Sequence, residues 1–457
     1  MPTKLSLYLL LITTWFAAAP AQIPDTLWTK LYGDTRHDEA TCLTATADNC
    51  YVAGCGGLAT LMKFDEQGDT LWCRDYGVTA TSILQTLDGG YAVTVAEGDK
   101  NLIKTDGSGD SLWSRDYDMN VFAARQTSDG GYILSGSANV EGYLHCCLLK
   151  TDSLGFVDWQ HTYAIGEVAT GNSLELTDDG GYFTAGPAHF EANCWDYFLL
   201  KVGASGDSVW TKTYGYEVTP EEAYGMIQCD DGGFLISGLY FWTVRTDAAG
   251  DTLWTDYYGY GEIGCAYSIL QAADDGFLLG GTIDPSGGDD GEFCLIKIDD
   301  DGYMEWLLLY GQLSQPGGGS LDMGQALVKA HDGSLIMAGK TRRTSADDFN
   351  VWLIKIGRET GISENLFSMP DNFGLLRAFP NPFNLSTTIT FDMVEPGRAN
   401  LRLYDLLGRE IMTIDNRYRP AGEHHLVFDA VSLPSGIYFF ELQAGDRRSW
   451  KKITLIK

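Results

Sequence analysis

A tryptophan-bearing segment repeats along this chain, and it limits the architecture more than any other feature. The segment is clearest at residues 101–117, which read N-L-I-K-T-D-G-S-G-D-S-L-W-S-R-D-Y. Its Trp recurs at steps of 44, 41, 46, 51, 44 and 52 residues, at Trp28, Trp72, Trp113, Trp159, Trp210, Trp254 and Trp306. A period of about 40 to 50 residues is typical of a four-stranded propeller blade or a comparable solenoid unit.

A second signature precedes the Trp segment in each repeat and predicts a hairpin turn. Strong copies read Asp-Gly-Gly-Tyr or Asp-Gly-Gly-Phe at 88–91, 129–132, 179–182 and 231–234, and weaker copies occur at 48–51, 274–277 and 332–335. Gly adopts positive φ without penalty, so these dipeptides favour tight turns between strands. An apolar strand, an Asp-x-x-Gly turn and the Trp strand follow. Each repeat therefore predicts four antiparallel strands, with the Trp packed between neighbouring blades.

These repeats predict an all-β protein with a seven-bladed β-propeller over residues 24–358. The chain opens with a Trp strand at 25–32 that has no hairpin before it, and the last repeat, 326–356, lacks its outer strand. We expect the first strand to pair with the last blade, because this pairing removes two open sheet edges.

The Trp segments resemble a known docking repeat. Residues 104–113, K-T-D-G-S-G-D-S-L-W, resemble the Trp-docking repeat of quinoprotein-type propellers, with a turn one residue shorter, and more distantly the Asp-box hairpins of sialidase-like propellers. Both families use the hairpin structurally, so the resemblance implies a fold and not an activity.

The character of the sequence changes after a linker at residues 359–374. Ordered motifs follow in the region 375–457, and they include Pro380, Asn381, Pro382, Phe383, Gly408, Arg409, Pro434, Gly436 and Tyr438. This region resembles the C-terminal type A sorting domain of type IX secretion cargo. The resemblance implies export through the outer membrane by the secretion machinery. The alternating strands themselves predict a small Ig-like β-sandwich, which without the resemblance reads as a binding module.

Residues 1–21 predict a secretory signal peptide. Lys4 precedes an apolar run at 5–19, and a small-residue cleavage site ends at Ala21. The run is short for a bilayer span of about 20 residues and contains Thr13 and Thr14, so we do not expect a membrane-spanning chain. We expect the protein outside the cell or on its outer surface, after passage through the periplasm.

The charge distribution excludes one class of partner. The formal net charge is -31, yet the region 375–457 holds 11 basic and 9 acidic side chains, so the segment between the signal and the tail carries about -34. Such a field repels phosphate backbones and anionic lipid. We therefore expect no nucleic-acid partner and favour divalent cations or neutral polymers as partners. We also expect the protein to be a monomer.

The ten cysteines leave their pairing open, because buried strand cysteines and disulfides are both compatible with an exported chain. A hairpin centred on 48–49 would place Cys42 opposite Cys55. Cys146 and Cys147 are adjacent on a predicted strand whose residues alternate faces, which disfavours a bond between them. Dispersed histidines predict no metal site. Acidic turns at 284–292 and 299–302 suggest calcium as the one candidate cofactor, although a solvated turn is the favoured interpretation.

Candidate ligand-binding residues lie in the longer loops, all of which connect strands at the face opposite the short turns. They are Trp195, Tyr240, Phe241, Trp242, Asp289, Asp290, Asp347 and Asp348. Sugar rings stack on aromatic side chains and hydrogen-bond to carboxylates, so a glycan or surface polymer is the predicted ligand. No catalytic motif is evident, and we favour a binding or adhesion module. The alternative is a glycoside hydrolase that uses two loop carboxylates.

Overall fold

The computed structural model describes the chain in seventeen segments. They are residues 24–33, 37–57, 59–95, 100–190, 194–215, 221–258, 264–284, 291–311, 321–342, 349–358, 377–379, 385–393, 397–405, 409–420, 422–431, 433–444 and 447–455. Every regular element within these segments is a β-strand, and the described residues contain no helix. The protein is therefore all-β, as the sequence predicts.

Seven antiparallel sheets occupy the described residues between 24 and 358, and each has four main strands. Six of them are built from consecutive strands, and the β14–β18 sheet carries one extra short strand. The strand bounds are β1 Thr26–Tyr32, β2 Glu39–Ala45, β3 Tyr51–Gly56, β4 Leu61–Phe64, β5 Thr70–Arg74, β6 Ala80–Gln85, β7 Tyr91–Val95, β8 Leu102–Thr105, β9 Ser111–Arg115, β10 Asn120–Gln126, β11 Tyr132–Val140, β12 Tyr143–Thr151, β13 Val157–Tyr163, β14 Val168–Ala169, β15 Ser173–Leu176, β16 Tyr182–Phe190, β17 Cys194–Val202, β18 Ser208–Tyr214, β19 Ala223–Gln228, β20 Phe234–Gly238, β21 Trp242–Thr246, β22 Thr252–Tyr257, β23 Gly264–Gln271, β24 Phe277–Ile283, β25 Glu292–Ile298, β26 Met304–Tyr310, β27 Leu321–Lys329, β28 Leu335–Arg342 and β29 Asn350–Ile356.

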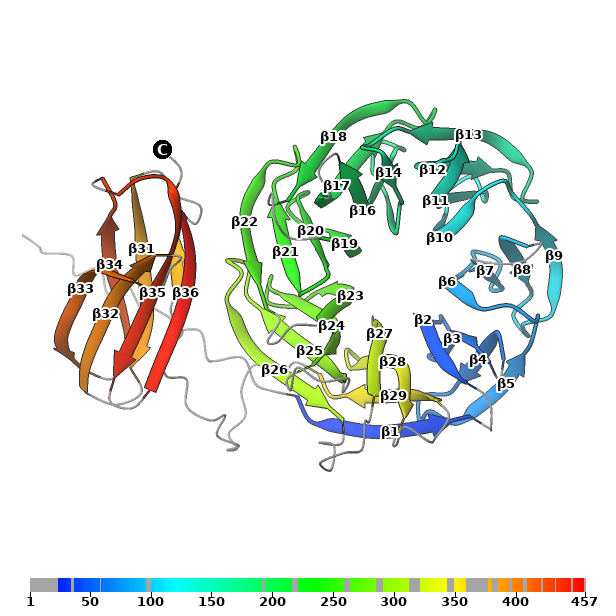
Figure 1. Cartoon of the computed structure of the whole chain (residues 1–457). Coiled ribbons are helices and arrows are strands. Elements are labelled where there is room, and N and C mark those ends of the chain that lie inside the picture. Colours follow the sequence, from blue (N-terminus) through cyan, green and yellow to red (C-terminus); the bar gives the residue numbers. More distant parts are fainter. Residues whose placement is uncertain are drawn as a thin grey trace, which may run out of the picture. The chain divides into compact units, whose positions relative to one another are not determined.

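The first strands of these sheets form a closed circuit. Strand β2 contacts β6, and the series continues through β10, β15, β19, β23 and β27, which contacts β2 again. Figure 1 shows β2, β6, β10, β19, β23 and β27 innermost around a common axis. This arrangement is propeller-like. We call the end that carries the Asp-Gly-Gly and Asp-x-x-Gly turns the turn face, and the opposite end the loop face.

The sheet of β27, β28 and β29 takes its outer strand from the start of the chain. Strand β1 pairs antiparallel with β29, and Trp28 lies opposite Lys355 while Tyr32 lies opposite Val351. The strand order is β1-β29-β28-β27. This pairing covers the edge of β29, which would otherwise expose unpaired backbone groups.

The Trp of an outer strand docks onto the neighbouring sheet. Trp113 on β9 packs on Gly155 in the β12–β13 turn, where an added Cβ would lie 2.8 Å from the indole. The Trp113 ring also lies 5.9 Å from the ring of Tyr132, and the Tyr117 hydroxyl donates to the Gly155 carbonyl at 2.8 Å. The same Trp-on-Gly contact recurs at Trp28–Gly68, Trp72–Gly109 and Trp159–Gly206. Apolar clusters between adjacent sheets surround these contacts and form the core.

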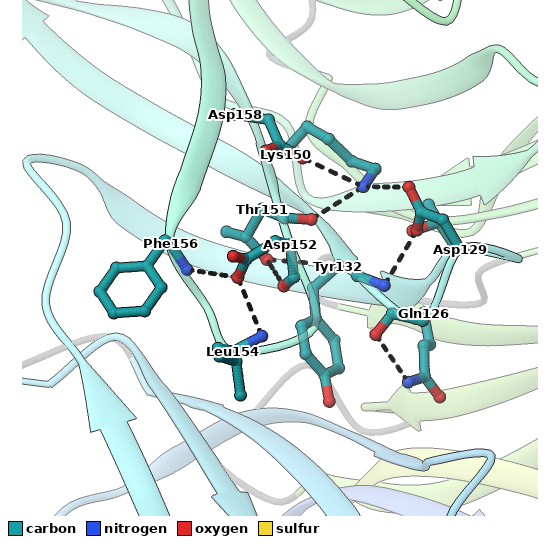
Figure 2. Close-up of polar contacts among 12 residues, drawn as sticks. Gln126, Asp129, Tyr132, Lys150, Thr151, Asp152, Leu154, Phe156 and Asp158 are labelled. Atoms are coloured by element: carbon teal, nitrogen blue, oxygen red, sulfur yellow. Dashed lines mark hydrogen bonds and ion pairs between the residues drawn. The ribbon is translucent and has the colours of Figure 1, made fainter.

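A basic side chain, buried in six of the seven sheets and half-buried at Lys201, ties each Asp hairpin to the third strand of its sheet. In Figure 2 the Lys150 ammonium reaches Asp129 at 2.8 Å and also donates to the Thr151 carbonyl at 2.8 Å. Lys150 and the Thr127 hydroxyl lower the pKa of the Asp129 carboxyl to about 2. Equivalent ion pairs of 2.6–3.2 Å occur in all seven sheets, at Asp48–Lys63, Asp88–Lys104, Asp179–Lys201, Asp231–Arg245, Asp274–Lys297 and Asp332–Lys355.

The predicted placement of Cys42 opposite Cys55 is wrong. A bulge between Ala40 and Cys42 shifts the register, so Cys42 lies opposite Gly54 and Cys55 lies opposite Ala40. None of the nine cysteines whose side chains the structure describes forms a disulfide. Cys146 and Cys147 are buried in different clusters on the two sides of β12, as alternation along a strand predicts.

The described residues from 377 to 455 form two further sheets. Their orders are β30-β31-β34 and β33-β32-β35-β36. One core joins them, in which Phe391 and Phe428 pack with Leu401, Leu403 and Phe440. The strands are β30 Arg377–Phe379, β31 Ser386–Met393, β32 Gly397–Asp405, β33 Glu410–Arg419, β34 Gly422–Asp429, β35 Gly436–Ala444 and β36 Arg447–Leu455.

Candidate functional site

A long hairpin on the loop face carries the candidate site. Strands β16 and β17 are nine residues each, and their outer ends pair His189 with Trp195. The two rings lie 5.1 Å apart at an interplanar angle of 59°. Strand β14 pairs with β16 on its other side, where Val168 lies opposite His189. Trp195 is half-buried, and the paired strands β14, β16 and β17 support it.

Glu167 completes this cluster beside the aromatic pair. Its backbone N–H donates to the His189 carbonyl at 2.7 Å, which fixes the loop before β14. Its carboxylate lies 3.3 Å from His189 Nδ1, and the Glu167 side chain remains 49% exposed. His189 therefore lies between the indole ring of Trp195 and the half-exposed carboxylate of Glu167. We call Glu167, His189 and Trp195 the loop-face cluster.

The neighbouring carboxyl group of Asp196 has a different environment. Burial raises the pKa of Asp196. Its side chain packs against Gly215, the residue that follows β18, because an added Cβ there would meet Asp196 Oδ1 at 2.0 Å.

Three of the predicted aromatic residues come from the connection between β20 and β21, and two of them are buried. Tyr240 and Phe241 both have positive φ, of 58° and 52°, which makes this connection a tight turn. The turn directs Phe241 and Trp242 inward, with 0% and 1% exposure. The prediction that these two side chains bind a ligand at the surface is therefore wrong. Tyr240 is half-buried, and its N–H donates to the Gly264 carbonyl at 2.6 Å.

The four predicted acidic ligands, Asp289, Asp290, Asp347 and Asp348, lie outside the described residues. The hydrolase alternative depends on them and stays a prediction. Of the predicted calcium segments, 285–290 is also outside, whereas Asp299 uses its carboxylate to accept the Tyr303 N–H at 2.6 Å. Within the described segments, no group of three or more His, Cys, Asp or Glu side chains is placed to hold a metal ion.

The seven predicted structural Trp residues lie on the outer strands. Trp306 is 1% exposed, and the other six are half-buried. In the C-terminal part, Arg409 is exposed and the Pro434 carbonyl accepts the Tyr438 hydroxyl at 2.9 Å, just before Gly436 begins β35. The other predicted sorting residues, Pro380, Asn381, Pro382, Phe383 and Gly408, lie outside the described residues.

A family model for the "secretion system C-terminal sorting domain" matches residues 377–457. This segment is a type IX sorting domain. The sorting domain implies contact with the secretion machinery and export to the cell surface or the extracellular space. A search of curated proteins finds no match to the chain. In the described part of the chain, no helix has the length and hydrophobicity needed to cross a bilayer.

Solved structures give weak similarities. A Bacteroides caccae protein of unknown function is 13% identical, with a TM-score of 0.41 over 60% of this chain and 94% of its own. PorZ, a surface component of the type IX secretion system of Porphyromonas gingivalis, is 12% identical, with a TM-score of 0.38 over 91% of this chain and 56% of its own. BamB from Moraxella catarrhalis is 11% identical, with a TM-score of 0.40 over 69% and 85%. At these TM-scores the propeller-like description rests on strand topology.

Two residues of the loop-face cluster could not be identified from the sequence. His189 and Glu167 are separated from Trp195 by 6 and 28 positions and belong to no motif. The Lys or Arg that pairs with the hairpin Asp of each sheet was also missed, although it has a signal in the sequence. Lys or Arg recurs two residues before the first Asp of most Asp-x-x-Gly turns, as in Lys104 and Lys150.

Proposed function

We propose that the protein is an exported seven-bladed β-propeller that binds a glycan or another surface polymer through the loop-face cluster. In this proposal residues 1–21 are the signal peptide, 24–358 the propeller, 359–374 the linker and 375–457 an Ig-like sorting sandwich. The observation that carries the proposal is the placement of Trp195 and Glu167 against the same His189 on a hairpin that β14 supports. The sorting domain supports placement of this cluster outside the cell.

The cluster has the chemistry that sugar recognition needs. The exposed part of the Trp195 indole offers an apolar platform for the C–H face of a pyranose ring. The Glu167 carboxylate accepts hydrogen bonds from hydroxyl groups beside that platform. Because β14, β16 and β17 hold the groups in place, little side-chain entropy is lost on binding. The acidic ring favours a neutral polymer at this site.

A glycan array with the purified mature protein tests this proposal. Binding to at least one neutral polysaccharide is expected, and Trp195→Ala should weaken it by about tenfold or more, the loss expected when an aromatic anchor is truncated. Tyr143→Ala is the matched control, because Tyr143 is 56% exposed at the tip of the neighbouring β11–β12 hairpin and lies outside the cluster. Absence of binding across the array, or equal losses in the two variants, would contradict the proposal.

A further inference from the structure

The repeats provide an internal reference for the turn face, and the seam between the last sheet and the first departs from it and contains a hollow. The residue three positions before the hairpin Asp ends the first strand of each sheet. In two seams this residue is a Gln that closes the gap to the preceding sheet. Gln85 Oε1 accepts the Ala47 N–H at 2.8 Å, and Gln126 Oε1 accepts the Leu87 N–H at 2.8 Å. Along the chain the position holds Ala45, Gln85, Gln126, Leu176, Gln228, Gln271 and Lys329.

The departure occurs where the sheet of β27–β29 meets the sheet of β2–β5. Ala45 stands in the Gln position and has no side-chain oxygen to offer to the preceding turn. His331 of that turn instead reaches across the seam and donates from Nε2 to the Thr46 carbonyl at 2.9 Å. A hollow of about 600 Å³ results, and its walls include Thr44, Ala45, Ala47, Gln85, Lys329 and His331.

The hollow is positively charged inside a strongly acidic ring. Lys329 replaces the Gln of other repeats, is exposed, and takes part in none of the ion pairs found among the described residues. The nearest hairpin carboxylates are already neutralised, because Asp48 pairs with Lys63 at 2.6 Å and Asp332 pairs with Lys355 at 3.2 Å. Since Lys329 has no carboxylate partner among the residues that the structure describes, its ammonium can pair with a ligand anion.

We propose that this hollow binds the carboxylate of a small acid or of an acidic sugar. Lys329 supplies the ammonium donor. In the Gln85 and Gln126 seams, a Gln oxygen accepts the backbone N–H of the residue before the hairpin Asp. His331 is that residue in this seam, and an oxygen of the ligand accepts its N–H. The Gln85 amide N–H₂ is the third donor, since its Oε1 is held by Ala47. Charge-assisted hydrogen bonds of this kind are the strong ones. The site lies on the turn face and is independent of the loop-face cluster.

Calorimetric titration of the mature protein with sodium glucuronate, sodium succinate and glucose tests the proposal. Two variants install the residue that other repeats use, Lys329→Gln and Ala45→Gln, so both should fold. We expect Lys329→Gln to weaken carboxylate binding by about tenfold or more, as the loss of a charged donor predicts. Ala45→Gln should abolish binding by filling the seam. Arg358→Gln removes a cation from the adjoining hollow and should leave affinity within about twofold, because rim charges contribute little.

The outcomes separate the sources of the carboxylate. Binding of glucuronate alone supports an acidic sugar, and binding of both anions supports any small carboxylate. Trp195→Ala should bind glucuronate as the unmodified protein does, and glucose should give no signal in that variant. The proposal is overturned if neither anion binds at millimolar concentration, or if Lys329→Gln and Ala45→Gln both bind unchanged. None of these results depends on whether the loop-face cluster binds a glycan.

Discussion

Replacing Gly155 by Ala tests the Trp docking that joins the sheets. Gly155 has φ of +79°, which an L-residue adopts only with strain of about 1–2 kcal/mol. The new Cβ would also lie 2.8 Å from the Trp113 indole. Tyr132 on one side holds that ring, so it must shift, and overpacking of this kind costs about 1–3 kcal/mol. The two effects predict a loss of roughly 2–5 kcal/mol.

The chain contains a matched control for this substitution. Gly89 has φ of +83°, and an added Cβ there meets nothing within 4 Å. Gly89→Ala should therefore show the backbone strain alone, about 1–2 kcal/mol. Urea unfolding followed by tryptophan fluorescence measures both variants. If Gly155→Ala is no less stable than Gly89→Ala, the Trp113–Gly155 contact does not join the sheets as we describe.

Three other predictions address the ion pairs, the first strand and the tail. The pKa of Asp129 is lowered to about 2 by Lys150, so its stabilising contribution is fully present above the unfolded pKa and is lost as pH falls toward 2. In the unmodified protein the urea unfolding midpoint should fall between pH 5 and 2.5 as Asp129 is protonated. Asp129→Asn should make this fall smaller, and an equal fall in the variant would contradict the prediction. Deleting residues 25–32 should lower the melting temperature by several degrees, because β29 loses its partner; an unchanged melt would show that β1 is dispensable. A chain truncated after Phe373 should keep its circular dichroism spectrum and melting transition but accumulate in the periplasm, and normal export would refute the sorting role.

The sequence by itself determined the sheets and the export domain, because both depend on short-range chemistry. The turn at Asp129 needs positive φ at Gly130 and a carboxylate that accepts the Gly131 N–H, and both requirements lie within three residues. Such turns set the strand count of each repeat. The sorting motifs are likewise contiguous segments that can be recognised before folding.

Local patterns misled where a small backbone change redirected side chains. The segment around Tyr240 resembles an exposed aromatic loop, yet two successive positive φ values bury Phe241 and Trp242. A single bulge likewise removes Cys42 from its predicted position opposite Cys55. One-residue shifts move side chains to the other face of a sheet, and hydrophobicity does not reveal them.

Only the tertiary structure brought together the residues of each candidate site. Glu167 and Trp195 both contact His189 because β14 and β17 pair with opposite sides of β16. Ala45 and Lys329 are 284 positions apart and line one hollow because the last sheet packs against the first. Contacts of this kind follow from closure of the circuit of sheets, in which each seam joins distant segments, so no local pattern in the chain encodes them.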